Sequence, residues 1–131
     1  MAVVTFDPRS LSTPVYEALS GLRQNNPEDK HKDQKNQAVE LYTYLATWGM
    51  MRLKAEENAL NQDGKKQVVK KYFECLQTLS GQQNLAGHQG LDVLKKLSAD
   101  DYLGLTGLGL ELANEFSFWA NAVYHDVKGE Q

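Results

Sequence analysis

The sequence has one cysteine and three prolines, and it lacks a long apolar run. Its single cysteine, Cys75, cannot form an internal disulfide. All three prolines precede residue 28, so the rest of the chain lacks the strongest helix breaker. No apolar run approaches the roughly 20 residues of a membrane span, and the start, MAVVTFDPRS, does not resemble a secretory signal. We therefore expect a soluble, non-exported protein of the cytoplasm that does not contact a membrane.

Positive charge is also limited. Lys and Arg number 14 against 17 Asp and Glu, for a formal net charge of -3. A chain with this balance does not coat nucleic acid indiscriminately, so any nucleic-acid contact must be local. A length of 131 residues is enough for one domain with a buried core.

Two helices are predicted before Gly64, one from its capping residues and one from its apolar spacing. Thr13 as N-cap and Pro14 at the first helical position predict a helix from about Thr13 to Arg23, after an N-terminal arm over residues 1–12. Residues 24–37 contain no apolar side chain and are predicted to form a polar loop whose first part is mobile. Spacings of three and four from Ala38 onward predict one long helix from roughly Asp33 to Leu60.

Three more helices are predicted after Gly64, giving about five in all. One ends before Gly81, a short one spans LDVLKKL, and the last begins after the cap Ser98 and continues to about Val127. The prediction is a single all-α domain over residues 1–131, a helical bundle with two long helices. Trp48 and Trp119 fall on the apolar stripes of those long helices and are expected to be largely buried.

Three glycines, Gly104, Gly107 and Gly109, lie close together in GLTGLG. A phosphate-binding loop needs its glycines between a strand and a helix start, or a following Lys with Ser or Thr, and this stretch has neither. Glycine inside a helix instead permits another backbone to approach closely. The three glycines are therefore candidates for packing against another helix of this chain or against another chain.

Catalytic and metal-binding patterns are weak. The histidines are scattered along the chain, and His125 cannot pair with the adjacent Asp126 on one helix face. Glu111 and Glu115 share a face at i and i+4, as paired glutamates on a solvated helix commonly do. We predict a protein that is not an enzyme and has no cofactor, metal or small-molecule substrate. The open alternative is an enzyme that uses these glutamates, or a metal held partly by His125.

The basic residues point to a different kind of site. Several basic residues, Lys54 among them, gather in the middle of the chain. Lys and Arg side chains grouped on one surface hold a nucleic-acid backbone by charge. The alternative is an ordinary solvated charged face. The candidates for nucleic-acid binding are Arg52, Lys65, Lys66, Lys70, Lys71, Lys95 and Lys96.

The C-terminal run DDYLGLTGLGLELANEFSFWANAVYHD resembles the last helix of the small helical subunits of CRISPR effector complexes, most closely the RAMP-type (type III-B, Cmr) small subunit. YLATWGMMRLKAEE and FECLQTLSG are similar in layout, and the resemblance covers roughly Ala38 to Val127. It implies a non-enzymatic protein whose copies stack into a filament beside the larger subunits and the crRNA. The basic residues above would then face guide or target strand, and the glycine helix would contact other copies.

Besides the enzyme considered above, two functions remain open. The first is a small CRISPR subunit with crRNA, target strand, larger subunits and copies of itself as partners. The second is a stand-alone helical adaptor or regulator that binds only protein.

Overall fold

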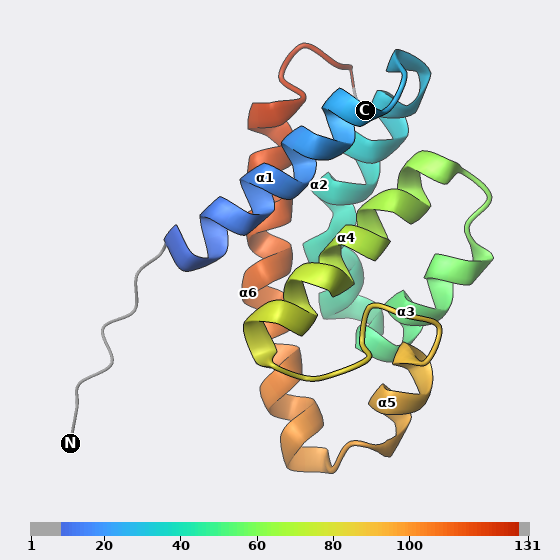
Figure 1. Cartoon of the computed structure of the whole chain (residues 1–131), viewed down its shortest axis with the longest axis vertical. Coiled ribbons are helices and arrows are strands. Elements are labelled where there is room, and N and C mark those ends of the chain that lie inside the picture. Colours follow the sequence, from blue (N-terminus) through green and yellow to red (C-terminus); the bar gives the residue numbers. More distant parts are fainter. Residues whose placement is uncertain (1–8, 129–131) are drawn as a thin grey trace.

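The computed structural model describes residues 9–128, which form six α-helices and one 3₁₀ turn, with no strand in that range (Figure 1). The all-α prediction is confirmed. Between residues 9 and 128, none of the helices combines the length and apolar character that crossing a bilayer requires. The elements are α1 (Arg9–Asn25), η1 (Glu28–Lys30), α2 (His31–Trp48), α3 (Met50–Ala59), α4 (Asp63–Ser80), α5 (Gly90–Lys96) and α6 (Ala99–Val123).

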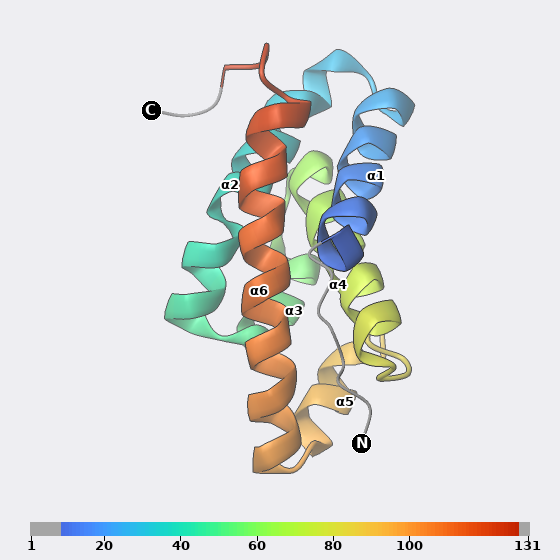
Figure 2. The ribbon, with the colours of Figure 1, turned by 90° about the vertical axis from the view of Figure 1, so that its left-hand side faces the viewer.

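The longest helix, α6, organises the bundle. It runs along the long axis between α1 and α2, with α4 behind it (Figure 2). The short helices α3 and α5 pack against each other and lie toward the end of the molecule where α6 begins (Figure 1). This arrangement lets one apolar stripe of α6 be covered along most of its length.

The core is one cluster of buried apolar side chains drawn from every α-helix. At its centre the ring of Tyr72 meets the ring of Phe116 edge to face, with centroids 5.8 Å apart. The Tyr72 hydroxyl donates a 2.8 Å hydrogen bond to the carbonyl of Gly109, so the one polar atom of this ring is satisfied inside the core. Helices α4 and α6 are thereby joined by both apolar and polar contacts.

The first helix starts earlier than predicted. Residues 9–12 belong to α1, so an arm over residues 1–12 is wrong there, while residues 1–8 lie outside the described residues. Thr13 is not an N-cap, and Pro14 lies inside the helix. The reason is Leu11, which extends the apolar stripe by one turn and is buried against the core, so burial outweighs the boundary signal of the proline.

The predicted polar loop over residues 24–37 is mostly helical. Helix α1 continues to Asn25, and α2 already begins at His31 after the 3₁₀ turn. The prediction was wrong because it required an apolar side chain to bury a helix face. Gln34 lies on the inner face of α2 and is fully buried although it is polar. Its amide is hydrogen-bonded on both sides: Tyr124 Oη donates to Gln34 Oε1 at 2.7 Å, and Gln34 Nε2 donates to Gln67 Oε1 at 2.8 Å.

The predicted long helix over residues 33–60 is two helices. Gly49 separates α2 from α3 with φ 87° and ψ 168°, a conformation that residues with a side chain rarely adopt. The break turns Trp48 outward, and this side chain is 52% exposed rather than buried. Trp119 is half-buried, packed against the core from α6.

Other predicted helix ends are confirmed. Gly81 closes α4 in the left-handed conformation, and Ser98 Oγ accepts from the Asp101 N–H at 3.1 Å to cap α6. Helix α6 ends at Val123, four residues before the predicted end. The residue that follows, Tyr124, is buried and carries the chain back onto α1 and α2.

Candidate nucleic-acid interface

The seven predicted basic residues lie on three different helices. Arg52 is on α3, four lysines are on α4, and Lys95 and Lys96 are on α5. On α4 itself they point in two directions: Lys66 and Lys70 face α3, whereas Lys71 lies beside Pro14 of α1. The structure therefore does not bring all seven onto one surface.

Lys66 and Lys70 line a hollow between α3 and α4. The hollow has a volume of about 290 Å³ and includes Asn58, Gln67 and two carboxylates, Glu57 and Asp63. Lys65, the residue before Lys66 on α4, is half-buried. Within the described residues, no carboxylate forms an ion pair with Lys65, Lys66 or Lys70. Among the lysines of the predicted set, these three are the ones without an ion pair in the described part of the chain.

One carboxylate that lines the hollow, Glu57, belongs to a buried ion pair. Lys54, expected to add surface charge, is only 3% exposed and donates to Glu57 Oε2 at 3.2 Å. Its ammonium lies 4.7 Å from the ring centroid of Phe73, and its stem packs against Gly90 of α5. Nothing in the spacing of the residues predicts this burial, which ties α3 to α4 and α5. Lys54 serves packing and not recognition.

The remaining lysines of the predicted set have acidic neighbours one helical turn away. Lys71 pairs with Glu74 at 3.3 Å, and Lys96 pairs with Asp92 at 2.9 Å. Lys95 lies 3.9 Å from the same carboxylate, and the hydrogen bond from Lys96 lowers the pKa of Asp92. Pairs of this kind are common on solvated helices and reduce the charge presented to a polyanion.

Arg52 is held by aromatic side chains of α2. Its guanidinium carbon lies 4.1 Å from the ring centroid of Trp48. Tyr44 lies one turn before Trp48. Burial and then the charge of Glu56 raise the pKa of the Tyr44 hydroxyl, and the Arg52 charge opposes part of that rise. Arg52 and Trp48 form a flat, partly exposed surface, the Trp48–Arg52 stack, at the α2–α3 break.

The three glycines of α6 differ in their surroundings. All three lie inside one helix, which is incompatible with a phosphate loop between a strand and a helix. A Cβ on Gly109 would come within 2.5 Å of Met50 and 2.6 Å of the Tyr72 hydroxyl, so this glycine is required by packing within the chain and is not a surface contact. Gly104 and Gly107 are exposed and face open space, which leaves both as candidates for contact with another chain.

The catalytic alternatives gain no supporting geometry. Glu115 accepts a hydrogen bond from Ser12 that joins α1 to α6, while Glu111 is exposed. Among residues 9–128 no group of three or more His, Cys, Asp or Glu side chains is placed to hold a metal ion. Burial raises the pKa of the Cys75 thiol to about 11, which keeps it protonated and a poor nucleophile at neutral pH.

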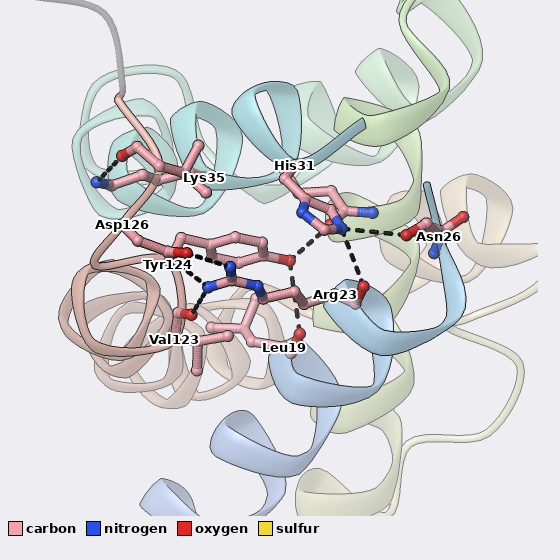
Figure 3. A network of polar contacts seen from close by, with 10 residues as sticks. Leu19, Arg23, Asn26, His31, Lys35, Val123, Tyr124 and Asp126 are labelled. Atoms are coloured by element: carbon pink, nitrogen blue, oxygen red, sulfur yellow. Dashed lines mark hydrogen bonds and ion pairs between the residues drawn. The ribbon is translucent and has the colours of Figure 1, made fainter. Parts of the chain in front are cut away.

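A polar network closes the end of the bundle where α1 meets α2 (Figure 3). Arg23 donates to both carboxylate oxygens of Asp126, at 2.6 and 2.7 Å, and to the carbonyl of Val123 at 2.5 Å. His31 Nε2 lies 2.9 Å from the Arg23 carbonyl and 3.1 Å from that of Asn26, so this nitrogen carries the proton. The network fixes the chain after α6 and is structural.

We predict that Asp126→Asn lowers stability in a pH-dependent way. The hydrogen bonds from Arg23 hold the pKa of Asp126 well below its usual range. A depressed carboxyl pKa stabilises the fold above the unfolded pKa of about 4, and this contribution is lost as pH falls below that value. The melting temperature of the variant should lie below that of the parent at pH 7, and the gap should shrink at pH 3.

Asp29→Asn, at an exposed carboxyl in η1, is the matched control and should leave the melting temperature almost unchanged at both pH values. Equal melting temperatures of the Asp126 variant and the parent at pH 7 would show that the ion pair with Arg23 adds nothing.

No protein-family model, curated protein or solved structure matches the chain. The basic hollow between α3 and α4 and the Trp48–Arg52 stack are thus defined from this structure alone.

Proposed function

We propose that the chain is a non-catalytic small subunit of a CRISPR RNA-guided effector complex, located in the cytoplasm. Its partners are the larger subunits, copies of itself, and the crRNA and target strand. The resemblance of the C-terminal run supports this proposal, and that run forms α6, the helix on which α1 and α2 pack. The run is thus a structural element of the bundle and not a peripheral extension.

The observation that carries the nucleic-acid part is the basic hollow between α3 and α4. Lys66 and Lys70 line it and form no ion pair in the described chain, whereas its two carboxylates, Glu57 and Asp63, are paired with other lysines. Ammonium groups of this kind neutralise phosphates and release counterions, independently of base sequence. We place the backbone contact here and assign Lys71, Lys95 and Lys96 a secondary role, because each is paired with an acidic neighbour.

The test compares two triple variants that remove the same charge. Changing Lys65, Lys66 and Lys70 together to glutamine should weaken binding of single-stranded RNA and flatten its salt dependence. Loss of three phosphate contacts lowers the slope of log K against log salt by about 2 for a single strand. The control replaces Lys71, Lys95 and Lys96 by glutamine, and its slope should stay close to that of the parent.

Equal weakening by both triple variants would mean that only net charge matters. Unchanged binding by the first variant at low salt would show that the hollow is solvated surface. The fold should survive in both variants, since exposed and half-exposed lysines contribute little to stability.

The second candidate, an adaptor that binds only protein, is favoured by large apolar side chains on α6. Leu103 is 68% exposed and Phe118 is 62% exposed, and such side chains often mark protein contacts. In the proposed subunit the same helix, with Gly104 and Gly107, is the candidate contact between copies. The subunit is expected to retain RNA in a way that weakens steeply as salt rises, and the adaptor is expected to retain none.

A further inference from the structure

The backbone conformation at the end of α2 places Trp48 at the surface. It is the last residue of α2, and the positive φ of Gly49 directs the chain into α3 immediately after it. The next residue, Met50, is fully buried, which anchors the break in the core. Tyr102 Oη of α6 accepts a 3.1 Å hydrogen bond from the Met51 N–H and fixes the start of α3. A half-exposed indole is thus presented on a rigid corner.

Arg52 completes the surface. Its guanidinium carbon lies 4.1 Å from the centroid of the Trp48 ring, an aromatic side chain of α2. Within the described residues no carboxylate forms an ion pair with Arg52. An aromatic ring and a guanidinium without an ion-paired carboxylate in the described chain are therefore held side by side, and 52% of the tryptophan is exposed.

This combination fits an unpaired nucleotide better than an apolar protein surface. An indole stacks on any base, while a guanidinium neutralises the adjoining phosphate or stacks as well. Phe118 offers the contrast: its ring contacts Trp119 of the same helix at 5.1 Å, and no cation–π contact is formed by it in the described chain. The Trp48–Arg52 stack therefore differs from the exposed apolar side chains of α6, because a positive charge lies at its aromatic ring.

We infer that the Trp48–Arg52 stack binds a base of single-stranded RNA, with Trp48 stacking on the base and Arg52 neutralising its phosphate. The inference rests on the proposed function, because it names a second contact for the same strand that the basic hollow holds. It adds base stacking to a site otherwise recognised by charge alone.

Tryptophan fluorescence reports this contact directly. The chain has two tryptophans, so Trp119→Phe leaves Trp48 as the sole reporter and keeps a ring at position 119. The variant is titrated with unlabelled oligouridylate of about ten nucleotides, the length a strand-binding surface occupies. A parallel filter-binding assay measures RNA retention, and circular dichroism verifies the helical fold.

Quenching of the Trp48 fluorescence that saturates at the same RNA concentration as filter retention supports the inference. Retention without quenching overturns it and leaves the proposed function standing, since the RNA then lies elsewhere. Absence of both retention and quenching overturns both proposals. An abasic strand of equal length should be retained more weakly and should not quench, because it offers phosphates without bases.

Affinity of the full chain gives an independent readout. Trp48→Ala should weaken oligouridylate binding about 5-fold to 100-fold, the range for one stacked base. Arg52→Lys keeps the charge but not the planar group and should give a smaller loss. Tyr42→Ala, which removes another exposed aromatic ring of α2, is the matched control and should bind like the parent. Equal binding by Trp48→Ala and the parent would overturn the inference, and so would an equal loss in Tyr42→Ala.

Discussion

Truncating Phe116 to alanine is expected to lower the free energy of unfolding by about 3–5 kcal/mol, the range for a large aromatic core side chain. Phe116 is fully buried and packs against the equally buried ring of Tyr72. Removal leaves a cavity where α4 meets α6, and neither long helix can shift to fill it without disturbing its own contacts. Since a domain is typically stable by only about 5–15 kcal/mol, the melting temperature should fall by roughly 10 °C or more.

Trp48→Ala is the matched comparison, because it removes a larger ring that is 52% exposed. Its cost to stability should be about 1 kcal/mol or less, as for substitutions outside the core. Denaturant unfolding of both variants checks the pair. Similar losses in the two variants would contradict the break at Gly49, since Trp48 would then lie in the core as a continuous helix requires.

Replacing Gly109 by leucine is expected to destabilise the fold by about 2–3 kcal/mol or more, as overpacking of a core does. The new Cβ alone would lie 2.6 Å from the Tyr72 hydroxyl. Met50, the other close neighbour, can move the end of its flexible side chain, but the Tyr72 ring is held by its hydrogen bond to the Gly109 carbonyl. The substitution therefore strains the junction of α4 and α6.

Gly107→Leu is the control on the same helix. No atom lies within 4 Å of a Cβ placed there, so the isolated protein should gain about 0.5–1 kcal/mol from the higher helix propensity of leucine. Thermal unfolding of the two leucine variants should thus move in opposite directions. A stable Gly109→Leu variant would contradict the close packing of α6. Loss of assembly in a stable Gly107→Leu variant would support contact between copies.

Most of the fold follows from the spacing of apolar residues, because each helix buries one stripe. The errors arose where a polar or backbone requirement outweighed that spacing. Gln34 is buried since its amide finds two partners, Tyr124 and Gln67, that lie far away in sequence. Gly49 breaks a helix whose apolar spacing continues across it, and only the glycine directly after Trp48 gave a local sign of the break.

The candidate site was less predictable, because surface charge depends on neighbours that helix packing supplies. Periodicity placed Lys66 and Lys70 correctly on one side of α4, but it could not show that α3 forms the opposite wall of a hollow. The burial of Lys54 depends on α5, which reaches it from a distant part of the sequence. The Trp48–Arg52 stack is not predictable from apolar spacing, because that spacing places both residues in one continuous helix with the indole inside.

The central claim, that this chain is a subunit of an RNA-guided complex, is tested most directly by copurification from the cell that produces it. A tagged copy should retain short crRNA and larger protein subunits through washing at moderate salt, and the variant lacking Lys65, Lys66 and Lys70 should retain less RNA. Recovery of the tagged chain alone, or with protein partners and no RNA, would contradict the claim and favour the protein-only adaptor.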